Sequence, residues 1–382
     1  MKKLVFAALS STLAVTAAHA QSSVTLYGLI DAGLMYTNNV AKGGAQGPLF
    51  QVTSGEINGS RFGLRGGEDL GGGMKAIFVL ENGFNVANGK LGQDNRLFGR
   101  QAFVGLSSSQ FGTLTLGRQY DSLTDFVTPL SATAGTFGDT GFAHPFDNDN
   151  LNHSVRMNNS VKYTSNDYAG FKFGALYAFS NNQDFATNRA YSVGASYNYG
   201  PLNFAAAYLQ INGSNSATNT GGAVDLAESQ SNGTGGFQLG ADVQRTAGAA
   251  LNYSFGPAVV GFVYTHSQFE NTKSFGSANG DVRFDNYELN GKYALTPAVS
   301  LAAAYTYTDA HVTDSAGFGA DPKWNQVDLQ AVYSLSKRTD VYAEGIYQHA
   351  TGHGYVAFIN NSGGASSTGN QVVGTVGMRT RF

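Results

Sequence analysis

The sequence predicts an all-β fold, a sixteen-stranded antiparallel transmembrane β-barrel. Three observations lead to this prediction. Apolar and polar residues alternate along most of the chain, short turns alternate with long polar loops, and charged residues make up only 13% of the composition, about half the usual share for soluble domains. Beyond the N-terminus no apolar run approaches the roughly 20 residues of a membrane helix, so membrane-spanning segments would have to be strands.

The N-terminus has the pattern of an export signal. Met1–Lys3 is positively charged, residues 4–18 are apolar, and Ala18-His19-Ala20 fits the small-x-small cleavage rule. The apolar run is short for a membrane helix, and a polar segment follows it. We therefore expect residues 1–20 to be a signal peptide and residues 21–382 to be the barrel domain.

The composition excludes several classes of protein. The formal charge of −3 becomes −5 when the two lysines of the signal are removed, and this mild acidity gives no reason to expect a nucleic-acid partner. The chain has no cysteine, so an exported form of it cannot depend on disulfides.

Individual segments show the alternation expected of membrane strands. In residues 171–179, Phe171, Phe173 and Phe179 lie on one face, with Lys172 on the other. Many segments run about ten residues, the length that a tilted strand needs to cross a bilayer, whereas strands of soluble proteins average five or six. Aromatic residues at segment ends suit the interfacial girdles of a membrane barrel.

The connections give the strand count. Seven short connections have hairpin turn chemistry: 69–73, 109–112, 166–170, 200–201, 256–257, 296–297 and 336–339. With both termini on the side of these turns, seven turns require sixteen strands. We expect the strands to begin near residues 23, 60, 74, 96, 113, 158, 171, 190, 202, 243, 258, 283, 298, 325, 340 and 371. Because hydrocarbon leaves no backbone group unpaired, the last strand must pair with the first, and a barrel of this size is wide enough for an aqueous channel.

The order of several motifs resembles the general diffusion porins of beta-proteobacteria, of the Neisseria, Bordetella, Burkholderia and Comamonas types. The resemblance covers the mature chain and is carried by residues 23–31 (SVTLYGLID), 60–73 (SRFGLRGGEDLGGG), 100–106 (RQAFVGL), 116–120 (LGRQY), 158–163 (NNSVKY) and the terminal Phe382. It implies a homotrimer of sixteen-stranded barrels in a Gram-negative outer membrane, with a pore-constricting third loop. It also implies passive diffusion of ions and small hydrophilic solutes, and no cofactor. The expected partners are the bilayer, lipopolysaccharide and the assembly machinery, for which Phe382 would be the signal.

The connection from Asp121 to Asn152 would be the third loop. A loop of about thirty residues in a compact domain points to function. We expect Asp121, Asp125 and Asp139 to face the constriction. Two histidines and two aspartates near the end of the loop match no metal-ligand spacing, so no metal site is predicted.

The wall opposite this loop should carry positive charge, because facing rows of unlike charge select permeating ions. The alternation directs five basic side chains into the lumen: Arg61, Arg65, Arg100, Arg156 and Lys162. The position of Arg100 requires Phe103 to face outward, which would turn Val104 and Leu106 inward. A constriction role is favoured for Arg61, Arg100 and Arg156, whereas Arg65 and Lys162 could equally be ordinary lumen residues. These charges suggest a mild anion preference.

Arg118 shares the outward face of its segment with Leu114 and Leu116. An arginine that faces lipid near mid-membrane costs roughly 2–4 kcal/mol. A neighbouring subunit would remove this cost, and the first five strands are rich in glycine and alanine, which suits close packing. Arg118 is therefore predicted at the trimer interface, with a rim residue that snorkels to the surface as the alternative.

Three other functions fit parts of the pattern. A substrate-specific outer-membrane channel would need aromatic or arginine tracks in the lumen, and no inward aromatic ladder is present. A surface adhesin or secreted β-protein without a pore would differ in its location. A barrel enzyme would need a Ser/His/acid set, and the sequence contains none, so the protein is predicted not to be an enzyme.

Overall fold

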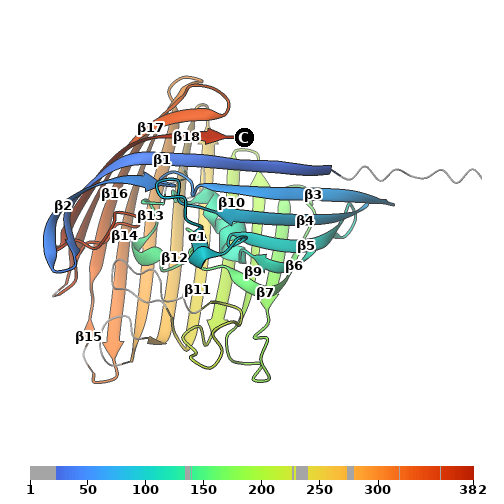
Figure 1. The fold of residues 1–382 in the computed structure, drawn as a ribbon, viewed down its shortest axis with the longest axis horizontal. Helices are drawn as coiled ribbons and strands as arrows, with labels where there is room; N and C mark the ends of the chain where they lie inside the picture. The colour runs from blue at the N-terminus through green and yellow to red at the C-terminus, as the bar shows by residue number, and fades with distance from the viewer. Residues whose placement is uncertain are drawn as a thin grey trace, which may run out of the picture.

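The computed structural model describes residues 23–133, 138, 140–225, 228, 240–272, 279–317, 319–352 and 354–382. The predicted signal peptide lies outside these residues. The described chain is almost entirely β-structure, wound as one curved sheet (Figure 1). Its strands are β1 (Ser23–Lys42), β2 (Ala45–Ser54), β3 (Arg61–Gly71), β4 (Met74–Gly83), β5 (Gln101–Ser108), β6 (Gly112–Gln119), β7 (Met157–Thr164), β8 (Phe171–Ala178), β9 (Arg189–Tyr199), β10 (Leu202–Asn212), β11 (Val243–Phe255), β12 (Ala258–Thr272), β13 (Gly280–Ala294), β14 (Val299–Asp314), β15 (Gly319–Ala320), β16 (Lys323–Ser334), β17 (Thr339–Thr351) and β18 (Asn370–Arg381). Across the described residues, no helix is long and apolar enough to cross a membrane.

The sheet is a closed antiparallel barrel with sixteen strand positions around its circumference. The described residues form eighteen strands, but two of these continue a neighbour. β1 pairs with β3 through residues 23–29 and with β2 through residues 32–42, so β2 and β3 together occupy one strand position. β15 extends β16 along the same edge of β14. β1 also pairs with β18, from Leu29 opposite Arg381 to Thr37 opposite Val373, which closes the barrel. The predicted strand number and closure are confirmed.

Most strands begin within three residues of the predicted positions, and two regions differ. The strand expected near residue 96 begins at Gln101, because the short helix α1 (Gly92–Asn95) and left-handed residues such as Gln93 (φ 47°) and Asp94 (φ 58°) precede it. The stretch between the predicted strand starts near residues 23 and 60 also contains a hairpin. Gly43 and Gly44, both with positive φ, make the turn between β1 and β2.

The alternation sorts side chains into an outer and an inner series. One row across β12, β13, β14 and β16 is exposed and consists of Phe262, Leu289, Tyr305 and Val327. The adjacent row is buried and consists of Val263, Glu288, Thr306 and Gln326. The apolar row suits lipid, while the buried row is covered by a loop inside the barrel.

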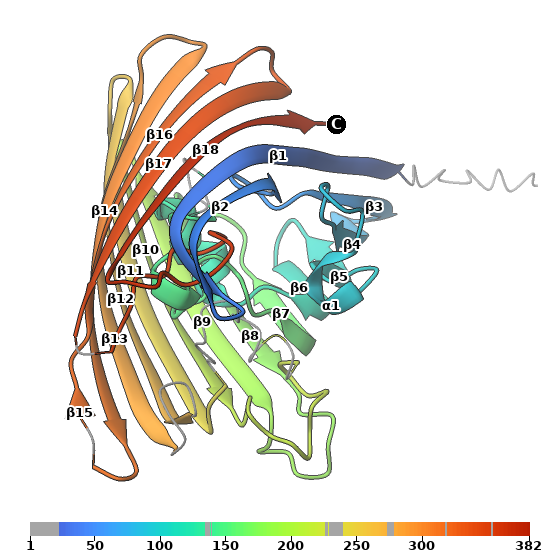
Figure 2. The ribbon, with the colours of Figure 1, turned by 60° about the vertical axis from the view of Figure 1, so that its left-hand side comes forward.

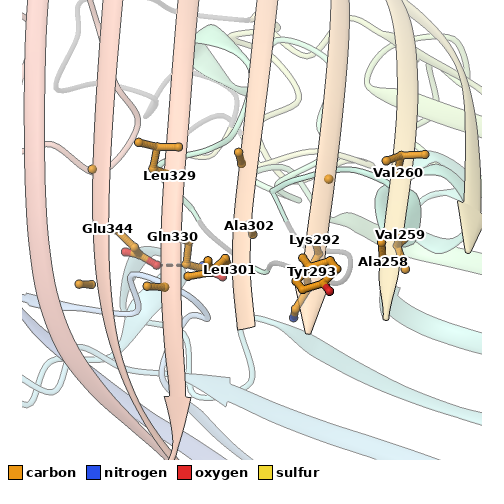
Figure 3. A pocket seen from close by; sticks show the side chains of 15 residues that line it. Ala258, Val259, Val260, Lys292, Tyr293, Leu301, Ala302, Leu329, Gln330 and Glu344 are labelled. Atoms are coloured by element: carbon orange, nitrogen blue, oxygen red, sulfur yellow. Dashed lines mark hydrogen bonds between the residues drawn. The ribbon is translucent and has the colours of Figure 1, made fainter. Parts of the chain in front are cut away.

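The outer series has a shallow apolar depression. A hollow of about 680 Å³ crosses β12 to β17 near their short-turn ends, where Val260, Tyr293, Leu301 and Leu329 surround smaller residues (Figure 3). Gln330 and Glu344 line the same region from the alternate series, and Gln330 Nε2 donates to Glu344 Oε1 at 3.0 Å.

The connection between β6 and β7 folds back into the barrel. It contains three short helical turns: η1 (Leu123–Val127), η2 (Thr128–Leu130) and η3 (Pro145–Asp147). Figure 2 shows these turns within the curve of the sheet. Leu123, Phe126 and Val127 pack in one buried cluster with side chains from β8 to β12. Gly194 makes room for them, because a Cβ there would lie 2.6 Å from Phe126 Cδ2.

Candidate functional site

Three arginines from separate parts of the wall lie close together inside the barrel. Arg61 opens β3, Arg100 immediately precedes β5, and Arg156 immediately precedes β7. Arg100 Nε lies 2.7 Å from Glu81 Oε1 on β4, and Arg61 Nε lies 4.0 Å from Oε2 of the same carboxylate. Two positive side chains therefore share a single acid, and Arg156 joins them on the other side of His153, on which all three arginines act.

Arg100 reaches this position for a different reason from the predicted one. Phe103 pairs with Val79 and Gly117 in the inner series, while Val104 pairs with Phe78 and Leu116 in the outer series, so the predicted outward position of Phe103 is wrong. Strict alternation would then turn Arg100 outward. Because it precedes the first residue of β5, its side chain can bend inward to Glu81.

Two aromatic side chains join the arginines. The guanidinium of Arg156 lies 5.8 Å from the Tyr120 ring centroid, within cation–π range. His153 stacks on the same ring, with centroids 5.2 Å apart and planes at 19°. Burial and the nearby charge of Arg100, followed by Arg156 and Arg61, hold the pKa of His153 well below its ordinary value. The imidazole is therefore neutral at pH 7.

The two remaining wall cations have different partners. Lys162 Nζ lies 2.7 Å from Asp125 Oδ2 on the third loop and donates to the Tyr120 carbonyl at 3.1 Å. The guanidinium of Arg65 lies 5.1 Å from the centroid of the Tyr27 ring, and Tyr27 Oη donates to Glu81 Oε2 at 2.9 Å. The structure therefore brings Lys162 to the predicted loop acid, but places Arg65 further along the wall.

Asp121 is fully buried and does not expose its carboxylate to the lumen. Oδ1 accepts the Leu123 N–H at 2.7 Å, and Oδ2 accepts Asn150 Nδ2 at 2.7 Å. Burial raises the pKa of Asp121 to about 6 although these hydrogen bonds lower it. This residue braces the loop from within. Asp139, the third predicted acid, lies outside the described residues.

A buried histidine fastens the loop to the opposite wall. His144 Nδ1 lies 2.6 Å from Asp149 Oδ2 and its Nε2 lies 3.1 Å from Glu288 Oε2 on β13. Burial by itself lowers the pKa of His144. The charge and hydrogen bond of Asp149, together with those of Glu288, outweigh burial and raise the pKa to about 10. The cationic ring joins loop and wall. Within the described ranges no group of three or more His, Cys, Asp or Glu is arranged to hold a metal ion.

Arg118 lies in the outer series, opposite Ala102, but it is buried by its own chain. Its Nε donates to the Gly99 carbonyl at 2.8 Å, and its terminal nitrogens bond Asn158 and Glu228. Glu228 belongs to the β10–β11 connection. The energetic reason for predicting a subunit contact, an unpaired arginine facing lipid, is therefore absent, and the trimer-interface role stays a prediction.

Phe382 is held at the seam of the barrel. Its backbone exchanges hydrogen bonds with Gly28, at 3.0 and 3.1 Å. A Cβ on Gly28 would lie 2.6 Å from the ring, so the glycine provides its seat. An assembly role for Phe382 stays a prediction.

The sequence did not single out Glu81, Tyr120 or His153. Glu81 follows Lys75, Ile77 and Val79 in the inner series of its strand. A single acid after two apolar residues in this series is the sequence feature that could have identified Glu81. Tyr120 and His153 lie at the two ends of the third loop, and only its fold brings them together.

Comparison with known proteins assigns this architecture. The family described as Gram-negative porin matches residues 7–353. The chain belongs to the Gram-negative porin family. An outer membrane porin of Bordetella pertussis is 35% identical over 375 residues, covering 91% of this chain and 94% of that protein. Outer membrane porin protein 32 of Delftia acidovorans is 31% identical over 383 residues, covering 98% and 93%. The predicted resemblance to beta-proteobacterial porins is confirmed.

Solved structures agree with this assignment. The porin superposes on an anion-selective porin from Comamonas acidovorans with a TM-score of 0.72 and 25% identity, covering 95% of this chain and 100% of the other. OmpT of Vibrio cholerae, in a trimer form, is 18% identical with a TM-score of 0.65 and shares the fold. The porin is thus an outer-membrane diffusion channel, and its family and fold are those of non-enzymatic channels.

Proposed function

We propose that this porin passes ions and small hydrophilic solutes by passive diffusion with a mild preference for anions. The observation that carries the proposal is the group of Arg61, Arg100 and Arg156 near His153, in which Arg61 and Arg100 share the single carboxylate of Glu81. Such a local excess of positive charge in a water-filled passage attracts anions and repels cations. Similarity to a solved porin described as anion-selective supports the same preference.

The constriction, in this proposal, lies between the wall and the third loop. The wall residues are Arg61, Arg100 and Arg156, with Arg65 and Lys162 contributing a weaker field. Of the three predicted loop acids, Asp125 is the one proposed to lie at the constriction, since Asp121 is buried within the loop and Asp139 lies outside the described residues. The pairing of Asp125 with Lys162 and the burial of Asp121 support a net positive passage, because neither carboxylate offsets the three arginines.

Reversal-potential measurements across planar bilayers in a KCl gradient test the selectivity. The wild-type channel should be anion-selective at neutral pH, and Arg156→Gln should move the reversal potential toward the cation side. Arg65→Gln is the matched control, because it removes the same charge outside the group that acts on His153, and it should have a smaller effect. Cation selectivity of the wild type would refute the proposal, and a barrel without conductance would favour a pore-free adhesin.

We also propose that the protein is a homotrimer and that Arg118 lies near the subunit interface. A Vibrio porin solved as a trimer shares the fold, which supports the assembly but does not locate the interface. Crosslinking of the solubilised protein should give a three-subunit species. Arg118→Ala should lower the temperature at which the trimer dissociates more than Arg65→Ala does.

Further proposals concern export and partners. Residues 1–20 would be removed, so the N-terminal residue of the membrane-bound protein should be Gln21. The terminal strand with Phe382 would be read by the assembly machinery, and the barrel would contact the bilayer and lipopolysaccharide. Enzymatic activity, cofactors and nucleic-acid partners form no part of this function. Deletion of Phe382 should reduce the amount of folded protein in the outer membrane while leaving synthesis unchanged.

A further inference from the structure

Three aromatic rings and one arginine form a cluster on the outer face of the barrel, at the long-loop ends of β8 and β9. The ring centroids of Tyr177, Phe179 and Phe185 lie 5.0, 5.9 and 6.3 Å apart. The guanidinium of Arg189 lies 5.8 Å from the Phe185 centroid. Phe179 and Phe185 are 39% and 51% exposed. The cluster therefore presents apolar rings and a positive charge to whatever surrounds the barrel.

The length of β9 places this cluster at the boundary of the membrane. The 11 residues of β9 run from Arg189 to Tyr199, and the short turn follows Tyr199. Because a tilted strand of roughly 9–11 residues crosses the hydrocarbon, Arg189 lies where β9 leaves it on the side of the long loops. These loops are extracellular in outer-membrane barrels. The cluster therefore lies at the level of the headgroups of the outer leaflet.

Two polar atoms of the cluster have no partner. Tyr177 Oη and Arg189 Nε are both buried and without a hydrogen bond in the described part of the chain. Tyr191, directly opposite Tyr177 in the sheet, differs in this respect, because its Oη donates to Gln210 Oε1 at 2.6 Å. Polar groups shielded from water are normally paired, so Tyr177 and Arg189 indicate an acceptor from outside the chain.

The charge of Arg189 is also uncompensated. Within the described residues its guanidinium contacts Phe185 and forms no ion pair. Asp184, the acid nearest in sequence, accepts the Ala186 N–H and the Thr187 hydroxyl. Arg245 on β11 also faces outward, but it pairs with Glu270. The positive charge and the free N–H donor of Arg189 therefore select an anionic acceptor, and a guanidinium matches the geometry of phosphate.

We propose that Tyr177 and Arg189, with the rings of Phe179 and Phe185, form a binding site for the phosphate-bearing headgroup of an outer-leaflet glycolipid. The inference rests on the proposed contact with lipopolysaccharide and gives that contact a place and a chemistry. The occupant is a lipid because the apolar surface continues from the donors toward the bilayer through Val193, which is 53% exposed and suits acyl chains. A free phosphate ion would gain nothing from these side chains.

Binding of diphosphorylated lipid A to the purified full-length porin, measured by native mass spectrometry in detergent, tests the site. Arg189→Gln should lower the affinity by about tenfold, as expected for a hydrogen bond between two charged groups. Arg245→Gln is the matched control, because it removes an outward arginine that already has an acid, and its affinity should be that of the wild type. An equal loss in both variants would show a general effect of charge and overturn the site.

The tyrosine pair gives a second, uncharged test. Tyr177→Phe removes the unpartnered hydroxyl and should weaken binding a few-fold, whereas Tyr191→Phe removes a hydroxyl that Gln210 already engages and should have little effect. Lipid A without its phosphates should bind the wild type as weakly as diphosphorylated lipid A binds Arg189→Gln. Equal binding of the two lipids would overturn the assignment to phosphate.

The remaining outcomes separate the site from the contact on which it rests. Equal affinity of wild type and Arg189→Gln would overturn the site and leave the lipopolysaccharide contact intact. A wild type that binds no lipid A would overturn the contact itself. Displacement of lipid A by inorganic phosphate at the same concentration would indicate a site for the free ion and overturn the lipid as occupant. Heat-modified migration on gels confirms that each variant is folded.

Discussion

Lys162 on the barrel wall and Asp125 on the third loop form an ion pair, with 2.7 Å between Nζ and Oδ2. Both side chains keep some contact with solvent, at 14% and 27% exposure. Each charge therefore cancels the other at the edge of the lumen, so neither adds fully to the field of the passage.

Removal of the carboxylate should uncover the lysine. Asp125→Asn leaves Lys162 unpaired, and one added charge near the ion path changes the energy of a passing anion by about 1 kcal/mol, equivalent to a few-fold change in permeability ratio. Anion preference should rise in Asp125→Asn and fall in Lys162→Met, as measured by reversal potentials. The anion preference of the double variant should return close to that of the wild type. Shifts of the anion preference in the same direction in both single variants would contradict the pairing.

Glu81 should stabilise the arginine group at a cost in anion preference. Its side chain and that of Arg100 are 7% and 6% exposed, so Glu81→Gln leaves a nearly buried guanidinium without its counter-charge. We expect a loss of roughly 1.5–3 kcal/mol of stability together with stronger anion selectivity. Urea unfolding in detergent measures the first effect. The double variant Glu81→Gln/Arg100→Gln should regain part of the stability, and a Glu81→Gln variant as stable as wild type would argue against the pair.

Gly194 should be needed for the third loop to pack against the barrel wall. An alanine methyl would lie 2.6 Å from Phe126, so Gly194→Ala should cost about 1–3 kcal/mol or displace the first helical turn of the loop. Unfolding in urea and the noise of the open-channel current report the two outcomes. Gly374→Ala is the matched control, because a Cβ there meets nothing within 4 Å. Equal stability of the two variants would show that the loop does not depend on this contact.

The interactions of His144 with the carboxylates of Asp149 and Glu288 should make the stability of the folded protein depend on pH. The folded pKa of His144, about 10, exceeds the value of about 6.5 expected in the unfolded chain. Its stabilisation is therefore complete below about pH 6.5 and disappears as the pH rises through 10. The difference in unfolding free energy between wild type and His144→Gln should shrink over this window. His266→Gln, at a half-exposed pair with Asp285, is the control and should show a smaller change.

The barrel was predictable because every strand repeats the same physical rule. Each must offer lipid an apolar side chain at every second position, and turn residues punctuate the pattern. The rule does not apply where strands leave the bilayer. The predicted strand starts therefore leave the β1–β2 hairpin, with polar Asn38 and Asn39 in its first arm, between two strands, and the left-handed residues before Gln101 shift the start of β5 past its predicted position.

The site was predictable only in part, because it depends on irregular backbone. Alternation identified Arg61 from within a regular strand, but Arg100 lies just before its strand, where alternation does not decide its direction. The sequence predicts that Asp121 faces the constriction, because it belongs to the connection expected to be the third loop. Its carboxylate instead satisfies backbone N–H groups at the start of η1, which local sequence does not reveal.

The pairing of β1 with β18 sets the order in which the fold can be completed. Leu29 finds its partner only when Arg381 is present, near the opposite end of the chain. Until that moment the sheet has two open edges, which are prone to pair with other molecules. Contacts of such high sequence separation also form slowly. A chain arriving N-terminus first must therefore wait, protected from aggregation, until its final residues have been delivered.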